Sequence, residues 1–232
     1  MHPLDNPIWQ ALTTSQAHFA RTAKSARRFP NDITTLGGFP EPSQENYDSL
    51  ATILDDDKAT GILFHSPQDP PAGWTVLAGI SLFQMVFLNG KSAASPSAQR
   101  PAPGFIELTA TDAPEMLALA ELTKPGPFGL RTRELGTYLG IRHGGNLAAM
   151  AGERLRVPGF TEISAVCTHP DHLGHGYATA LMAELAHRIH GRGEIPFLHV
   201  REDNTRAIAL YEHLGYQKRV LLHFAMVRKP AG

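Results

Sequence analysis

The chain has 232 residues, of which 42% are hydrophobic and 19% charged, and its formal net charge is -1 at pH 7. This composition is typical of a globular protein, and a charge near zero gives no bulk attraction to nucleic acid or to an anionic membrane. The single cysteine, Cys167, excludes an intrachain disulfide and a cysteine-based zinc cage. With no signal-like leader and no apolar run near ~20 residues, we expect a cytoplasmic protein without a membrane span.

The N-terminal part of the chain predicts a small α/β lobe. Helices are expected within residues 6–23 and 43–54, and strands within 59–66 and 73–87. The following segment, 89–104, is rich in Ala, Ser, Pro and Gly, which is typical of a linker. We therefore predict an N-terminal lobe over 1–88, a linker over 89–104 and a second domain over 105–232. The order of elements also allows the first lobe to be a degenerate copy of the second.

Strands and helices alternate after the linker. Strands are expected within 105–110, 136–143, 146–157, 160–168, 196–202 and 220–229, and helices within 112–123, 177–191 and 204–214. Between two of these strands, Gly144, Gly145 and Asn146 predict a tight hairpin, because that turn needs positive φ angles.

The stretch "THPDHLGHGYATALM", Thr168 to Met182, joins a predicted strand to a predicted helix through a glycine turn. The first N–H groups of a helix lack internal partners and lie at the positive end of its dipole, so this turn predicts an anion site. Gly174 and Gly176 let a phosphate approach the backbone without a Cβ in the way. A pyrophosphate is therefore the expected ligand.

Two common nucleotide sites fit the turn poorly. A Walker loop needs a lysine and a hydroxyl after its second glycine, where this chain has Tyr177 and Ala178, so ATP or GTP hydrolysis is disfavoured. A dinucleotide fingerprint needs a third glycine, where Thr179 stands.

A second motif, "DNTRAIALYEHLGY", follows from Asp203. Together the two resemble motifs A and B of the Gcn5-related N-acetyltransferases (GNAT), and "EISAVCTHPDHLGHGYATAL" is most similar to their FR47-like branch. The resemblance covers about 105–229. It implies an α+β (α/β) fold with a mixed, mainly antiparallel twisted sheet flanked by helices, splayed after Thr168 to admit the cofactor. It also implies transfer of an acetyl or acyl group from acetyl-CoA to an amine-bearing small molecule or peptide, by a monomer or homodimer.

The resemblance also implies a set of cofactor-binding positions. The end of the strand before the turn would bind the pantetheine arm through Val166, Cys167 and Thr168. The pyrophosphate would lie over the turn and the first helical turn, which comprise His172, Leu173, Gly174, His175, Gly176, Tyr177, Ala178 and Thr179. Leu173 replaces the Arg or Gln of the family pattern, so one phosphate contact is expected to be missing, with His172 or His175 as a supplement. Asn204 would cap the next helix and reach the cofactor, and a plain N-cap role is equally open.

Two residues are the candidates for acid–base chemistry. Tyr211 matches the family tyrosine that protonates the leaving thiolate, and a half-buried core tyrosine is the alternative. An alkylamine must lose a proton before it attacks, and Glu162 is our candidate base because strand alternation places it on the face of Ser164 and Val166. An exposed glutamate with only a surface contact is the alternative to that role.

Several other assignments complete the prediction. Glu107 and Glu153 compete with Glu162 for the role of base. The backbone N–H of Val166 is the expected oxyanion donor. His169, His172 and His175 straddle a proline and the glycine turn, so no metal site is expected.

The sequence leaves the acceptor and one rival function open. Residues 122–135, with material from the first lobe, are expected to set acceptor specificity. Direct transfer needs no covalent intermediate, which disfavours Cys167 as a nucleophile. The main rival is a CoA-binding sensor or interaction module that has lost transferase activity.

Overall fold

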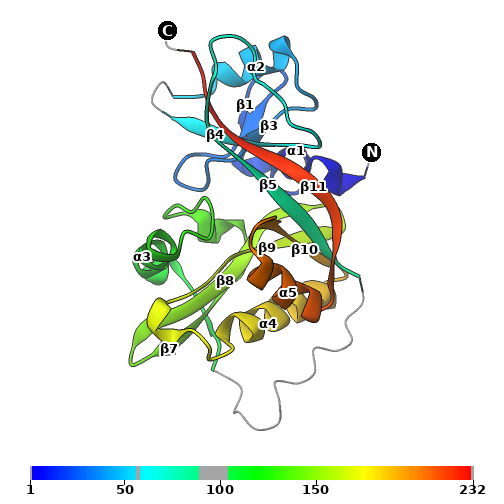
Figure 1. Ribbon diagram of the computed structural model, residues 1–232. Helices are drawn as coiled ribbons and strands as arrows, with labels where there is room; N and C mark the ends of the chain where they lie inside the picture. Colours follow the sequence, from blue (N-terminus) through cyan, green and yellow to red (C-terminus); the bar gives the residue numbers. More distant parts are fainter. Residues whose placement is uncertain (1, 56–57, 89–103, 231–232) are drawn as a thin grey trace.

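The computed structural model describes residues 2–55, 58–88 and 104–230, and its centre is an eight-stranded sheet (Figure 1). The strand order is β4-β11-β5-β10-β9-β8-β7-β6, and every neighbouring pair is antiparallel except β9 and β10. The strands are β4 Ala59–Phe64, β5 Thr75–Phe87, β6 Ile106–Glu107, β7 Tyr138–His143, β8 Asn146–Val157, β9 Phe160–Thr168, β10 Ile195–Arg201 and β11 Tyr216–Arg228. This mixed, mainly antiparallel sheet confirms the predicted fold class.

The helices pack on both faces of this sheet. They are α1 Pro7–Thr13, α2 Gln44–Ala51, α3 Ala113–Thr123, α4 Tyr177–Gly191 and α5 Thr205–His213. Short 3-10 turns lie at Pro3–Asp5, Ala17–Phe19, Ala110–Asp112, Thr132–Leu135 and Pro170–His172, and a second sheet is formed by β1 Arg21–Thr22, β2 Arg27–Arg28 and β3 Gly37–Gly38. No helix of the described residues is long and apolar enough to cross a membrane.

The N-terminal part contributes strands to the main sheet. Strand β5 lies between β10 and β11, with Gln84 opposite His199 on one side and Val220 on the other. Strand β4 pairs with the outer side of β11. Apart from Gly104, the expected linker lies outside the described residues. The division of the chain into two lobes stays a prediction.

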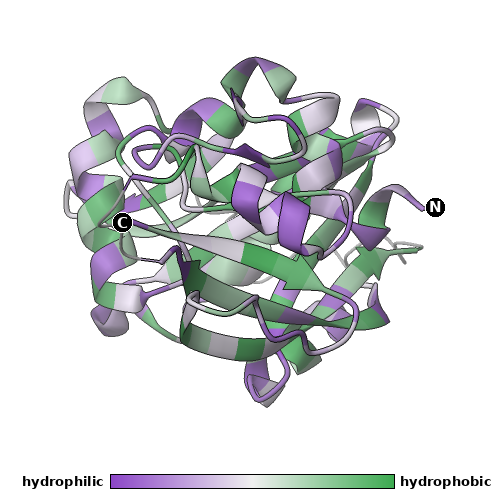
Figure 2. Ribbon diagram, turned by 90° about the horizontal axis from the view of Figure 1, so that it is seen from above, coloured by the Kyte–Doolittle hydropathy of each residue, from purple (hydrophilic) through white to green (hydrophobic). Residues whose placement is uncertain are grey.

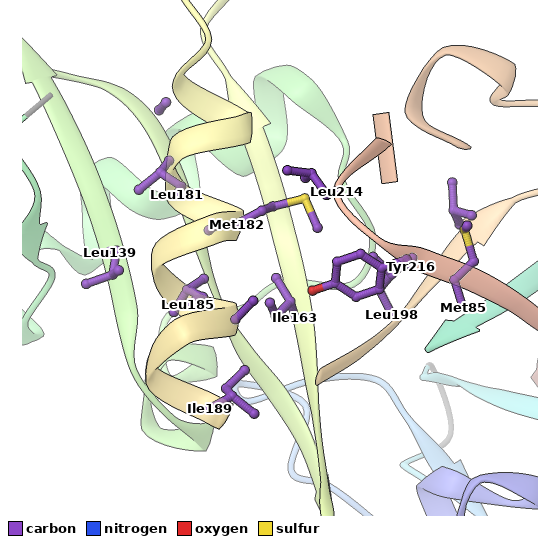
Figure 3. Close-up of a cluster of buried hydrophobic side chains, with 14 of the residues drawn as sticks. Met85, Leu139, Ile163, Leu181, Met182, Leu185, Ile189, Leu198, Leu214 and Tyr216 are labelled. Carbon is purple, nitrogen blue, oxygen red and sulfur yellow. The ribbon is translucent and has the colours of Figure 1, made fainter. Parts of the chain in front are cut away.

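Each face of the sheet has its own apolar core. On one face, Leu181, Leu185 and Ile189 of α4 pack against Leu198 of β10 and its neighbours (Figure 3). The opposite face is covered by α1 and α3, which pack on β8 and β9. In Figure 2 hydrophobic residues run along the central strands, whereas the helices alternate hydrophobic and hydrophilic residues. This alternation is what a helix with one buried face requires.

Local signals predicted the hairpin between β7 and β8 but not the end of the first helix. Gly144 and Gly145 have φ angles of 58° and 88° and form the hairpin between β7 and β8, as predicted. The helix expected within 6–23 ends at Thr13 instead. The Thr13 and Thr14 hydroxyls donate to the carbonyls of Trp9 and Gln10, and such side-chain bonds compete with continued helix.

Candidate active site

Strands β9 and β10 separate soon after they meet. They pair in parallel only at Phe160↔Ile195, Thr161↔Pro196 and Glu162↔Phe197. From residue 163 to 168, β9 keeps its partner β8 on one side and has no strand partner among the described residues on the other. The opening expected after Thr168 therefore begins earlier, directly after Glu162.

A β-bulge in β9 lies beside this opening. Met150 lies opposite Cys167 and Gly152 opposite Ser164, so β9 carries one residue more than β8 over this stretch. Ala165, buried at 6% exposure, takes the left-handed conformation with a φ of 52°. A non-glycine residue in that region is uncommon, and bulges that change side-chain direction are frequent next to active sites.

The bulge changes which side chains share a face. Cys167 packs with the α3 core, whereas Val166 packs against the α4 core. Glu162 binds His199, which alternates along β10 with Leu198 of the α4 core and so faces the other way. The expectation that Val166 shares a face with Glu162 is therefore wrong, because the extra residue inverts the alternation.

The glycine turn has the conformation that an anion site needs. Gly174 and Gly176 have φ angles of 79° and 78°, and a Cβ at either would meet nothing within 4 Å. Glycine is therefore required here by backbone conformation and not by a close neighbour. The first bond back to the start of α4 is from Ala180 N to Gly176 O. The N–H groups of Tyr177, Ala178 and Thr179 therefore have no hydrogen-bond acceptor among the described residues and point out of the N-terminal end of the helix.

Histidines surround the turn. The His175 Nδ1 lies 3.1 Å from the carbonyl oxygens of both His172 and Leu173, so this nitrogen carries the proton and donates. The His172 ring lies 4.7 Å from the ring of His143, at the end of β7. Leu173 is 52% exposed. No group of side chains that could hold a metal ion occurs in the described ranges.

Two family-motif residues belong to α5 and its cap: Tyr211 lies within the helix and Asn204 is its N-cap. Half-buried Tyr211 packs against the α4 core, as Val166 does, and burial raises the pKa of Tyr211 to about 12. The phenol therefore stays protonated at neutral pH and is a hydrogen-bond donor. Asn204 Oδ1 accepts from Ala207 N at 3.1 Å, so the N-cap role is present, and this bond leaves the amide Nδ2 unused.

Glu162 is fully buried in an ionic network. Its carboxylate accepts from Arg154 Nε at 2.9 Å and Nη2 at 2.6 Å, and from His199 Nδ1 at 2.7 Å. Burial alone would raise the pKa of Glu162, but the charge and hydrogen bonds of Arg154, with those of His199, lower it to about 2. The alternative of an exposed surface glutamate is wrong, because the side chain has 0% exposure.

The network fixes the tautomer of His199. Gln84 donates from Nε2 to the Leu4 carbonyl at 2.9 Å and accepts at Oε1 from Arg219, which orients the amide. Its Nε2 also lies 3.2 Å from His199 Nε2, so an N–H faces the ring at that atom. His199 therefore carries its proton on Nδ1, toward Glu162, and its lone pair on Nε2. Sequence reasoning missed Arg154 and His199, which lie on β8 and β10, outside the quoted motifs.

The competing carboxylates lie elsewhere. Glu153 pairs with Arg192 at 3.0 Å, next to the C-terminal end of α4. With Glu107 it lines a polar pocket of about 420 Å³ that also contains Arg133 and Arg156. Helix α4 has 15 residues, so its ends are roughly 22 Å apart, and the glycine turn lies at the other end.

Comparisons with known proteins agree with this geometry. The FR47-like protein family matches residues 138–225. A GNAT-family protein of known structure from Novosphingobium aromaticivorans is 35% identical, with 99% of each chain covered and a TM-score of 0.87. The chain belongs to the GNAT acetyltransferase superfamily. A GCN5-related N-acetyltransferase from Kribbella flavida, 16% identical with 96% of each chain covered, shares the fold at a TM-score of 0.61.

Curated relatives match only in part. N-alpha-acetyltransferase RimI from Mycobacterium tuberculosis is 38% identical over 101 residues, which are 40% of this chain and 63% of that protein. An acetyltransferase from Yersinia pestis is 45% identical over 51 residues, which are 21% of this chain and 36% of that protein. The chain thus spans less than two thirds of the length of these relatives.

Proposed function

We propose that this GNAT protein transfers an acetyl or other acyl group from acetyl-CoA to a primary amine by direct attack. The observation that carries the proposal is the free edge of β9, residues 163–168, which leads directly into the left-handed glycine turn and the start of α4. Acetyl-CoA would supply an activated acyl thioester.

The residues present fit this cofactor. The free edge of β9 offers backbone donors and acceptors, which suit the amides of a pantetheine arm as an added strand would. The N–H groups of Tyr177, Ala178 and Thr179 suit a pyrophosphate. Because a Cβ at Gly174 or Gly176 would meet only open space, a phosphate has room to approach the backbone there.

Tyr211 is proposed to stabilise the leaving sulfur. Its pKa of about 12 lies well above the ~8.5 of a free thiol, so full proton loss from the phenol to a thiolate is unfavourable. A hydrogen bond from the Tyr211 hydroxyl avoids that cost.

The amine proton is proposed to pass to the pair formed by Glu162 and His199. A carboxylate with a pKa of about 2 is a weak base, so Glu162 is assigned as the positioning residue that holds the proton on Nδ1 of His199. His199 Nε2 would accept one proton from the amine, directly or through water, in place of its contact with Gln84. As the nitrogen–acyl bond forms, the acyl carbon–sulfur bond breaks and the departing thiolate takes one proton from solvent. The nitrogen loses its second proton to solvent on forming the amide, and His199 returns the first to solvent, so an ammonium and acetyl-CoA give an amide, CoA thiol and one released proton.

A second candidate is a CoA-binding module without transferase activity, favoured by exposed Leu173 in place of the family Arg or Gln. Thiol release from acetyl-CoA over a panel of amines, with mass spectrometry of the products, separates the two. Amine-dependent thiol release with an acylated product supports transfer. Acetyl-CoA binding without amine-dependent release supports the module.

A further inference from the structure

A narrow pocket lies against β9 on the side that carries α3. Its walls include Phe128, Tyr138, Arg154, Ser164 and Ala165, and the space between them is too small for a water molecule. Ser164 and Ala165 belong to the stretch of β9 that has lost its β10 partner. The loop 125–128 forms part of the same wall. An occupant would therefore displace the loop and lie next to the proposed acyl site.

Tyr138 brings a buried hydroxyl without a partner to this pocket. The side chain is 1% exposed, and its hydroxyl has no hydrogen bond within the described residues. The ring is held edge-on to Phe128, and a Cβ at Gly152 would collide with it. Burial raises the pKa of Tyr138, and the positive charge of Arg154 opposes part of this rise. A buried unpaired hydroxyl destabilises the folded protein, so a group retained at that cost needs an explanation.

Arg154 brings a second free donor. Its Nε and Nη2 are both used by Glu162, whereas no bond of Nη1 is found in the described part of the chain. A Cβ at Gly126, in the loop, would lie 3.7 Å from this Nη1. The charge of Arg154 is already matched by Glu162, so a carboxylate here would add an uncompensated charge in a buried site. A neutral carbonyl oxygen would gain the same donors without that penalty.

We propose that Tyr138 Oη and Arg154 Nη1 bind a neutral carbonyl oxygen of the acceptor. Preferred acceptors are then amines with an amide carbonyl close to the nitrogen, as at the N-terminus of a peptide, over alkylamines and free amino acids. This inference rests on the proposed function, because it makes the occupant of the pocket the acceptor.

The test compares three amines of similar size, alaninamide, alanine and propan-2-amine, in wild type and Tyr138→Phe. The variant removes only the hydroxyl, so kcat/KM for alaninamide should fall about tenfold, the usual effect of losing one hydrogen bond. The value for propan-2-amine should stay unchanged. Because the amines differ in basicity, the variant-to-wild-type ratio is compared for each amine, and intrinsic reactivity cancels. In wild type, alaninamide should be used more efficiently than alanine when kcat/KM is expressed per concentration of neutral amine.

The matched control is Tyr47→Phe, because the Tyr47 hydroxyl is also buried with no hydrogen-bond partner among the described residues. Tyr47 lies in another apolar cluster, which α2 forms with β4 and β11. Tyr47→Phe should leave the variant-to-wild-type ratio of kcat/KM at one for all three amines. Thermal unfolding should be unchanged or raised in both variants. The inference is overturned if Tyr138→Phe changes kcat/KM by the same factor for all three amines, or if it leaves kcat/KM for alaninamide at the wild-type value.

A titration of the protein alone with alaninamide, followed by ligand NMR, gives a readout that is independent of turnover. We expect Tyr138→Phe to weaken binding several-fold and Tyr47→Phe to leave it intact. If wild type releases thiol with none of the amines, the proposed function fails, and this titration alone decides the inference. Equal alaninamide binding by wild type and Tyr138→Phe, or no binding by wild type, would then overturn it.

Discussion

Replacing Glu162 with glutamine would leave the buried Arg154 charge without its partner. The fall of the Glu162 pKa from 4.5 to about 2 corresponds to roughly 3 kcal/mol of folding free energy at neutral pH. Removing one member of a buried ion pair costs about 3–5 kcal/mol, which agrees with this value. For a chain of this size the melting temperature should fall by roughly 6–12 °C.

The pH dependence has a definite sign. The folded-state pKa of Glu162 lies below the ordinary 4.5, so the stabilisation is complete above that value and is lost as the pH falls toward 2. Thermal unfolding of wild type and Glu162→Gln, monitored by circular dichroism from pH 7 down to the acid limit of refolding, measures it. The gap in melting temperature should be constant at neutral pH and narrow below pH 4.5, with exposed Glu121→Gln as the control. A variant that melts within a degree or two of wild type at pH 7 would refute the buried network.

Three further outcomes follow from the site and the sheet. Tyr211→Phe should slow turnover about tenfold with acetyl-CoA affinity nearly intact by calorimetry; a parallel loss of affinity would make the tyrosine structural. Gly176→Ala places a residue with a Cβ in the left-handed region at a cost of about 1–2 kcal/mol, so it should weaken acetyl-CoA binding in the same titration. The control is Gly191→Ala, which has open space around it and should leave acetyl-CoA binding unchanged. A fragment of residues 105–232 lacks β5, so β10 and β11 would each have an exposed edge. This fragment should aggregate or unfold without cooperativity. A cooperative melting transition of the fragment would contradict the prediction.

The glycine turn was predictable because its signal is local. Gly174 and Gly176 lie next to the helix that they begin, and glycine is the residue type that adopts the left-handed conformation without steric cost. The hairpin at Gly144 and Gly145 was predictable for the same reason. Asn204 showed its capping role through its position before a helical pattern.

The surroundings of Glu162 depend on contacts between distant segments. The partners Arg154 and His199 come from two different strands, and Gln84 reaches the same network from a strand near the N-terminus. No spacing in the sequence specifies which strands are neighbours across a sheet, because register depends on the whole fold. The bulge at Ala165 could not be predicted from the sequence either, because alanine does not favour a positive φ angle. Alternation alone therefore placed Val166 on the wrong face.

The most direct test of the central claim is calorimetric titration of the purified protein with acetyl-CoA, beside ATP and NAD. The free edge of β9 and the glycine turn predict saturable binding of acetyl-CoA at one site per chain, with much weaker binding of the other two ligands. Absence of acetyl-CoA binding at millimolar concentration, or equal binding of ATP, would contradict the account.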